Sequence, residues 1–326
     1  MLMALVVSIF AFWVLLVMYD WIVRSSDSIA GGLLIGRRRR RKRLVVSGGG
    51  VVLLAALLWG GYGWGAETTV ISFMVILGFI DDWRDVAIVI RLLFYSAAVV
   101  LILFGQGWMQ LGGGLSLLVF LLYLGFVNAV NFMDGINGLV ILQTFVILLG
   151  MIWSGVWVDV AEFLWIVFGF TLAFSLFNVR KSARMYLGDA GSVGLGFVLM
   201  GLVLWKIYGG LSWGYLLYFL VMLMDTGMVL LWRLLKRENV FKKHHRHLYQ
   251  RMVRGLGWHE VLVSIGYAIV QLLVIVCWER ILKTSENMVM GVVGLVLLLL
   301  VSYALLYRWV HLEVVVLRQV LVPIQK

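Results

Sequence analysis

The chain consists largely of apolar runs close in length to a helix that crosses a lipid bilayer, which needs about 20 apolar residues. Such runs lie at residues 1–19, 44–60, 66–80, 88–105, 114–131, 138–155, 160–178, 190–208, 213–233, 259–278 and 288–308. The runs are long and do not alternate polar with apolar residues, so the sequence favours helices over a membrane β-barrel. We therefore predict an all-α fold, a polytopic helical membrane protein with about eleven transmembrane helices in a single domain over 1–326.

The composition agrees with a membrane protein and bears on its partners. Hydrophobic residues make up 63% of the chain and charged residues 13%, whereas about a quarter of a soluble domain is charged. In a soluble protein the net charge of +11 would suggest nucleic acid, but here the basic residues lie between the apolar runs, where they orient the chain. We expect membrane lipid, and no nucleic acid, as a partner.

Lys and Arg are concentrated in alternate connections between the runs. If the runs are spans, 24 of the 27 Lys and Arg residues fall on one side, and Lys206, Arg280 and Lys283 fall on the other. Basic connections stay in the cytoplasm, so we expect the N-terminus outside and the C-terminus inside. The unbroken basic run Arg37–Arg43 is interpreted as an anchor for this orientation that also attracts anionic lipids.

Four short polar islands interrupt the apolar runs, all on the predicted cytoplasmic side. They lie at 78–82, 128–135, 188–192 and 244–247. Carboxylates next to hydrocarbon are costly, so a set that converges on one face indicates a functional site. The cytoplasmic segments near 20–43, 81–88, 131–138, 178–190 and 234–258 are expected to form this active site.

The first island ends with Asp81 and Asp82 at the end of a predicted span. Adjacent side chains on a helix point about 100° apart, so one carboxylate can contact a cation while the other handles a proton. The alternative is a solvated pair at a helix terminus. An Asp-Asp pair is weak evidence alone and gains weight beside the other islands.

The second island places Asn128, Asn131 and Asp134 three residues apart, hence on one face of a helix. Two carboxamides and a carboxylate in one stripe can ligate a hard cation and bind a polar ligand. Hydrogen bonding between helices of the bundle is the alternative. Because Gly135 and Gly138 follow and break the helix, we favour a ligand site.

The third island, Gly188–Ser192, is a glycine-rich turn that opens a predicted span. A helix N-terminus of this kind suits a phosphate, and Asp189 can hold Mg²⁺ against it. An Asp helix cap is the alternative. Asn178 and Arg184, in the preceding connection, add a carboxamide and a fixed cation.

The fourth island contains His244, His245, Arg246 and His247, next to Lys242 and Lys243. Cations and imidazoles at this density suit a pyrophosphate. Zinc competes, but no carboxylate or cysteine accompanies the histidines closely enough to favour it, and a plain basic loop fits equally well. Asp225, inside a predicted span, is a lower-ranked candidate whose alternative is a structural hydrogen bond.

Together the islands describe a cleft with Mg²⁺ ligands, phosphate-binding glycines and basic residues. These are the parts of phosphoryl transfer, in which a metal ion and cations spread the developing charge. The membrane setting indicates that one substrate is a lipid.

In order and spacing, the islands resemble the motifs of the polyprenyl-phosphate N-acetylhexosamine-1-phosphate transferases, the bacterial glycosyltransferase family 4. The motifs that resemble the Asp-Asp, Asn-x-x-Asn-x-x-Asp-Gly and Gly-Asp-x-Gly-Ser signatures are Gly78-Phe79-Ile80-Asp81-Asp82, Asn128-Ala129-Val130-Asn131-Phe132-Met133-Asp134-Gly135 and Leu187-Gly188-Asp189-Ala190-Gly191-Ser192. His244 to Gln250 is similar to the His-rich loop of the O-antigen-initiating branch. The resemblance covers residues 24–262.

The resemblance implies an enzyme of the bacterial inner (cytoplasmic) membrane. It would transfer a sugar-1-phosphate from a UDP-N-acetylhexosamine to undecaprenyl phosphate, release UMP and initiate O-antigen or another surface polysaccharide. By the same resemblance, Asn131 and Asp189 would bind Mg²⁺, or Mn²⁺ in its place, and Asp189 would be catalytic. Asp81 or Asp82 would orient the lipid phosphate or take its proton. The implied substrate-binding residues are Arg91 for the lipid phosphate, Asp134, Asn137 and Asn178 for the nucleotide, His244, Arg246 and His247 for pyrophosphate or sugar, and also Asn128 and Arg184.

Departures from the family pattern leave alternatives open. Asn137 stands where family members usually carry Asp, the order of the His loop differs, and expected prolines before Gly48 and near Ser182 are missing. The sister enzyme, the phospho-MurNAc-pentapeptide transferase of peptidoglycan synthesis, usually shows three consecutive histidines; Arg246 interrupts them here, so we prefer the polysaccharide branch. A transporter of a phosphorylated lipid or anion, an inactive scaffold and a homodimer are kept as further hypotheses.

Overall fold

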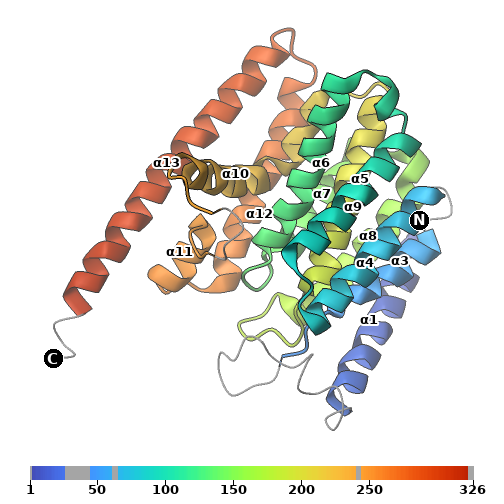
Figure 1. Cartoon of the computed structure of the whole chain (residues 1–326), viewed down its shortest axis with the longest axis horizontal. Helices are drawn as coiled ribbons and strands as arrows, with labels where there is room; N and C mark the ends of the chain where they lie inside the picture. The colour runs from blue at the N-terminus through green and yellow to red at the C-terminus, as the bar shows by residue number, and fades with distance from the viewer. Residues whose placement is uncertain (1, 26–44, 61–64, 240–243, 322–326) are drawn as a thin grey trace.

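The computed structural model describes residues 2–25, 45–60, 65–239 and 244–321 (Figure 1). Within these ranges the regular structure is helical, and the only β pairing is an isolated parallel bridge between Val46 and Met185. This confirms the all-α class. Eight of the described helical segments are long and apolar enough to cross a membrane, as expected of a polytopic membrane protein.

The helices follow the predicted apolar runs closely. In chain order they are α1 (Leu2–Ser25), α3 (Leu53–Gly60), α4 (Ala66–Arg84), α5 (Ile88–Gly105), α6 (Gly113–Met133), α7 (Leu139–Ser154), α8 (Ala161–Asn178), α9 (Gly188–Tyr208), α10 (Leu220–Leu235), α11 (Leu248–Gly255), α12 (Glu260–Cys277) and α13 (Met288–Leu321). Short 3-10 turns precede α3 (Gly49–Val52), α8 (Val158–Val160) and α10 (Trp213–Phe219), and a π turn, Trp278–Leu282, extends α12.

The predicted span 44–60 differs from the structure. Its described part is not helical before Gly49, where Tyr186 N donates to Val46 O at 2.8 Å and Gly49 N donates to Tyr186 O at 3.1 Å. Only Gly49–Gly60 is helical. Such a segment is about 18 Å long, short of a hydrocarbon core of about 30 Å. Pairing with the α8–α9 connection therefore replaces the first turns of the expected helix.

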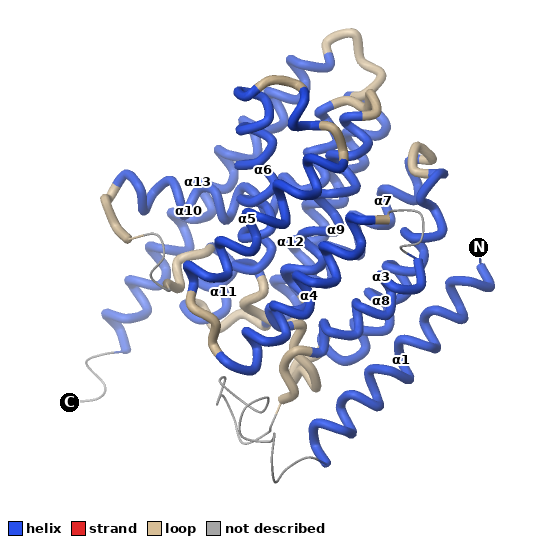
Figure 2. Tube along the Cα trace, turned by 45° about the vertical axis from the view of Figure 1, so that its right-hand side comes forward, coloured by secondary structure: helices blue, strands red, loops and turns tan. Residues whose placement is uncertain are grey.

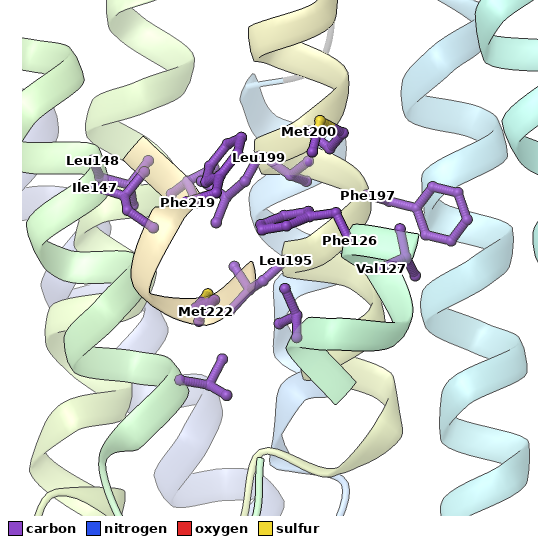
Figure 3. Close-up of a cluster of buried hydrophobic side chains, with 14 of the residues drawn as sticks. Phe126, Val127, Ile147, Leu148, Leu195, Phe197, Leu199, Met200, Phe219 and Met222 are labelled. Atoms are coloured by element: carbon purple, nitrogen blue, oxygen red, sulfur yellow. The ribbon is translucent and has the colours of Figure 1, made fainter. Parts of the chain in front are cut away.

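Helix α9 forms the centre of the bundle. An 18-residue stretch of this helix is 89% buried, because small residues allow its neighbours to approach. Figure 3 shows Phe126 and Val127 of α6 beside Phe197 and its neighbours on α9. The ring centres of Phe126 and Phe219 lie 4.3 Å apart, which closes this core toward α10.

The ends of the helices carry the polar islands. Figure 1 shows the α6–α7 and α8–α9 connections at the lower end of the bundle and the α12–α13 connection at the upper end. The C-terminal end of helix α13 stands apart from the other helices in Figures 1 and 2, and an 18-residue apolar stretch of this helix contains no buried residue. The bundle is thus compact around α9 and open along α13.

Candidate active site

The site begins where α4 and α9 meet, because glycines remove the side chains that would keep their backbones apart. A Cβ atom at Gly78 of α4 would lie 2.6 Å from the backbone oxygen of Asp189. A Cβ atom at Gly50 would lie 2.2 Å from the Cα atom of Gly191 in α9. Gly50 N also donates to Leu187 O at 3.0 Å. The last turn of α4 is thereby held against the first turn of α9.

Asp82 caps α9 from the end of α4. Its Oδ1 and Oδ2 accept hydrogen bonds from the backbone N–H groups of Asp189 and Ala190, both at 3.1 Å. A carboxylate is stabilised there by the free N–H groups and the helix dipole. Gly188 turns the chain with a φ of 72°, and a Cβ atom on it would lie 2.2 Å from the Asp82 carboxylate. The N–H groups that the sequence suggested for a phosphate therefore bind a carboxylate of the protein.

Arg91 of α5 joins two of the acidic groups. Its Nη1 donates to Asp81 Oδ2 and to Asp189 Oδ2, each at 2.6 Å. Asp81 also accepts a hydrogen bond from Val86 N at 2.5 Å. The side chains of Asp81, Arg91 and Asp189 are 8%, 21% and 26% exposed, so water screens these ion pairs only partly. Asp81 and its neighbour Asp82 point to different partners, as predicted for adjacent residues at a helix end.

The polar stripe of α6 ends beside this acidic cluster, which is formed by Asp81, Asp82 and Asp189. Asp134 follows the last residue of α6 and lies close enough to Asp82 for their charges to interact. Asn128 donates its Nδ2 to Leu124 O within its own helix at 2.8 Å. For Asn131, no side-chain hydrogen bond is found in the described part of the chain.

Asn137 and Asn178 tie two connections together at this end of the bundle. Gly138 N donates to Asn178 Oδ1 at 2.7 Å, and Asn178 Nδ2 donates to Met185 O at 2.9 Å. Asn137 Nδ2 donates to Arg180 O at 3.1 Å. Both side chains are buried, and these bonds hold the α6–α7 connection against the α8–α9 connection. Their contact with a nucleotide stays a prediction.

Asp225 organises the histidine segment, residues 244–250, a role that its low rank in the sequence did not reveal. This carboxylate of α10 is 1% exposed. Its Oδ1 lies 3.3 Å from His247 Nδ1 and accepts from Leu248 N at 3.2 Å and from the Tyr303 hydroxyl at 3.0 Å. Its Oδ2 accepts from the Tyr267 hydroxyl at 2.7 Å. Elements α10, α11, α12 and α13 thus meet at one buried carboxylate, whose only signal in the sequence is a lone Asp within an apolar run.

Tyr249 connects the histidine segment to α6. Its hydroxyl donates to Phe132 O at 2.8 Å, and its ring stacks on His247 with centres 5.6 Å apart. A Cβ atom at Gly135 would lie 2.1 Å from that hydroxyl, so the glycine of the second island makes room for it. The second and fourth islands therefore meet, through a tyrosine that sequence analysis did not single out.

The cationic residues of the histidine segment have partners within the protein. Arg246 Nη1 donates to both carboxylate oxygens of Glu238 at 2.7 Å, and this contact lowers the pKa of Glu238. The Arg246 guanidinium also lies 4.7 Å from the ring centre of Trp232. Burial, with the charges of His247 and nearby arginines, lowers the pKa of His244 to about 4. His244 is therefore neutral at neutral pH.

The structure thus brings only part of the predicted set into direct contact. Asp81, Asp82, Arg91 and Asp189 are joined by hydrogen bonds, and Asp134 lies near them. Arg184 is exposed, and its described hydrogen bond is the one from its backbone N–H to Phe177 O at 2.8 Å. Lys242, Lys243 and the basic run Arg37–Arg43 lie outside the described residues.

The acidic cluster fits a hard divalent cation. Within the described ranges no group of three or more His, Cys, Asp or Glu side chains is arranged to hold a metal ion. Mg²⁺ needs fewer protein ligands, because it keeps several waters and binds substrate phosphates beside one or two carboxylates. Asp81 and Asp189 already converge on one cation, Arg91. Their carboxylate oxygens are ligands of the type that Mg²⁺ or Mn²⁺ prefers, and the part of Asn131 in binding such an ion stays a prediction.

Comparisons with known proteins support the resemblance. Residues 65–207 match the model of the family described as Glycosyl transferase family 4. A phospho-N-acetylmuramoyl-pentapeptide-transferase from Lactobacillus gasseri is 32% identical over 168 residues, which cover 48% of this chain and 49% of that protein. The protein of the same name from Streptococcus equi subsp. zooepidemicus is 32% identical over 189 residues, covering 50% and 54%. The chain thus matches about half the length of these curated relatives.

The comparisons also bear on the choice between the two branches. The names of these relatives belong to the peptidoglycan alternative and not to the O-antigen-initiating branch that the histidine loop favoured. The family match contains the residues of the acidic cluster, Arg91, Asn131 and Asp134, whereas the histidine segment lies beyond it. The segment that is similar to this family of glycosyl transferases therefore contains the acidic cluster.

Proposed function

We propose that this chain is a family 4 glycosyl transferase of the bacterial inner membrane. It transfers a phospho-sugar from a UDP-linked amino sugar to undecaprenyl phosphate on the cytoplasmic side and releases UMP. The observation that carries this proposal is the bridge from Arg91 to Asp81 and Asp189, which joins residues of two separate motifs at one cation. Phosphoryl transfer depends on such positioning of charges around the phosphate groups. The apolar helices around the site suit an acceptor dissolved in lipid.

Each residue of the cluster then has a role. An oxygen of the lipid phosphate attacks the β-phosphorus of the UDP-sugar, and the bond from that phosphorus to the bridging oxygen of UMP breaks. Arg91 binds the lipid phosphate, while Asp81, released from Arg91, orients that phosphate and takes its proton when it arrives protonated. Asp82 fixes the first turn of α9 and so positions Asp189. Asp189 and Asn131 would hold Mg²⁺, which when bound spreads the negative charge of the diphosphate.

For the donor we propose UDP-N-acetylmuramoyl-pentapeptide, because relatives that are 32% identical are named for transferring that group. UDP-N-acetylhexosamine is the second candidate. The observation that favours it is Arg246, which interrupts the histidine run and is held by Glu238 in the structure. The histidine segment differs in this way and lies outside the family match, so it suits a different sugar.

The test is UMP release by the purified protein with undecaprenyl phosphate, Mg²⁺ and each UDP-sugar in turn. Asp189→Asn should lower the rate by about 100-fold, because it removes a charge that organises the transition state. Asp159→Asn is the matched control: Asp159 pairs with Lys206 at 2.5 Å and is 47% exposed, and its loss should change the rate less than about twofold.

Two results would overturn the proposal. One is no UMP release with any donor from protein that melts cooperatively, and the other is an Asp189→Asn variant as active as the wild type. The first result would favour the scaffold or the transporter of a phosphorylated lipid, and the second would show that Asp189 has no part in the reaction.

A further inference from the structure

Tyr95 is a buried tyrosine whose hydroxyl has no hydrogen-bond partner among the described residues. It lies in α5 and is 3% exposed. Buried polar groups in native proteins are nearly always paired, so an unpaired hydroxyl at this depth calls for a reason. One reason is a ligand that supplies the missing partner.

The position of Tyr95 directs its hydroxyl toward the acidic cluster. It lies four residues beyond Arg91 on α5, so the two side chains share one face of the helix. Long side chains in helices lean toward the N-terminus, which here is the end of α5 that carries Arg91. The groups whose charges reach the Tyr95 hydroxyl are Asp189, Arg91, Asp81 and Asp82. Tyr95 thus lies at the membrane-interior side of the cluster.

Tyr123 of α6 offers a comparison within the same structure. The rings of Tyr95 and Tyr123 both pack against Phe197, with centres 6.1 Å and 5.6 Å from it. The Tyr123 hydroxyl, also buried, donates to Phe197 O at 2.8 Å. Ring packing is therefore similar at the two positions, but of the two hydroxyls only that of Tyr123 forms a hydrogen bond with the described residues. A phenylalanine would pack equally well at position 95.

The surrounding charges indicate what the hydroxyl binds. Arg91 is the cation that contacts Asp81 and Asp189, and a phosphate competes with these carboxylates for its guanidinium. A neutral hydroxyl adds a second donor to a bound phosphate without changing the charge of the site. The tail of a lipid phosphate lies in the membrane, and Tyr95 lies on the membrane-interior side of the cluster.

We propose that the Tyr95 hydroxyl donates a hydrogen bond to the phosphate of the lipid acceptor, beside Arg91. This inference rests on the proposed function, because it assigns one more contact to the acceptor of that reaction. Tyr95 is then a substrate-binding residue that gains its partner when Arg91 turns from the carboxylates to the phosphate.

Equilibrium binding tests the inference without turnover. The dissociation constant of radiolabelled undecaprenyl phosphate is measured in detergent for wild type, Tyr95→Phe and Tyr123→Phe, and undecaprenol serves as the ligand without phosphate. Tyr95→Phe should raise the constant for the phosphate about tenfold, the effect of one hydrogen bond to a charged group, and leave undecaprenol binding and the melting temperature unchanged. Tyr123→Phe should lower the melting temperature and leave binding of the phosphate unchanged.

The outcomes separate the inference from the proposed function. Unchanged binding of undecaprenyl phosphate by Tyr95→Phe would overturn the inference. A weaker binding of the phosphate would also overturn it if undecaprenol binding weakens equally or the melting temperature falls with it. If the wild type binds undecaprenyl phosphate but releases no UMP, the proposed function fails while the binding comparison still decides the role of Tyr95. If the wild type does not bind undecaprenyl phosphate, the inference fails whatever the turnover.

Discussion

At the scale of single residues, the charge of Arg91 allows the acidic cluster to form. Asp81 and Asp189 point at the same guanidinium nitrogen, and Asp82 lies on the neighbouring N–H groups of α9. Without a cation, carboxylates brought this close repel one another strongly, because the site is only partly open to water. The arrangement of these carboxylates therefore requires a cation, and Arg91 supplies it in this structure.

Replacing Arg91 tests this dependence. Arg91→Ala should abolish UMP release and lower the free energy of unfolding by about 1–3 kcal/mol, less than the loss of a fully buried pair because Arg91 is partly exposed. Arg84→Ala is the control, since Arg84 is an exposed arginine that stacks on Trp83, and its loss should cost less than about 0.5 kcal/mol. Thermal unfolding in detergent measures both. Equal stability of the two variants would contradict the bridge.

A second prediction at this scale concerns pH. The pKa of His244 is about 4 in the folded protein, below the ordinary value of about 6.5 in the unfolded chain. Between these values only the unfolded chain takes up the proton, so His244 makes stability fall as the pH drops from about 6.5 to 4 and has no such effect above that window. The melting temperature of His244→Gln should therefore fall less between pH 7 and pH 5 than that of the wild type. His245→Gln, at the exposed neighbouring position, should behave like the wild type.

The sequence predicted the chemistry-bearing residues better than their contacts. Asp81, Asp82, Arg91 and Asp189 come together as the motifs suggested. That Asp82 would cap α9 could not be read from its motif, because the contact depends on how closely α4 approaches α9. Asp225 was ranked low for the same reason: its partners lie on three other helices that no local pattern connects.

At the scale of elements, the meeting of α4 and α9 decides the geometry of the site. Gly78→Ala would place a methyl group 2.6 Å from the backbone oxygen of Asp189, and backbone cannot move aside as a flexible side chain can. We expect a loss of about 1–3 kcal/mol in stability, as for other overpacked cores, together with reduced UMP release, because Asp82 and Asp189 are pushed apart.

The matched control lies on α6. A Cβ atom at Gly125 meets nothing within 4 Å, so Gly125→Ala should leave activity unchanged and melting temperature equal or higher. Melting temperature and UMP release of the two variants are compared side by side. Similar behaviour of Gly78→Ala and Gly125→Ala would show that the α4–α9 contact does not position the site.

Element boundaries could be predicted where hydropathy alone sets them. The long runs that became α5, α6 and α9 required no knowledge of their neighbours, whereas α13 continues to Leu321, beyond the predicted end at 308. Two elements did require it. The described residues before Gly49 are not helical, because the backbone there bonds to 185–187. Helix α11 was not anticipated, because an eight-residue helix with two arginines carries too little apolar length to be recognised.

At the scale of the whole molecule, different helices hold the two polar parts of the site. Helices α4, α5 and α9 hold the acidic cluster, whereas α10 to α13 hold the histidine segment around Asp225. The hydrogen bond from Tyr249 to Phe132 O joins the histidine segment to α6, whose end lies beside the acidic cluster. The exposed apolar side chains of α13 suit contact with lipid. The position of the histidine segment therefore depends on how α13 packs in the membrane.

The orientation of the bundle decides whether its acidic cluster can meet nucleotide sugars made in the cytoplasm. From the distribution of Lys and Arg we expect the α8–α9 connection inside and the α12–α13 connection outside. Ser182 and Ser285 are exposed residues of these two connections, and Figure 1 shows the connections at opposite ends of the bundle. The one cysteine, Cys277, is removed first by Cys277→Ala. In spheroplasts, a membrane-impermeant maleimide should then label the Ser285→Cys variant and should label the Ser182→Cys variant only after the membrane is opened. The reverse pattern would place the acidic cluster on the outer face, where a UDP-sugar donor is absent, and would contradict both the orientation and the transferase proposal.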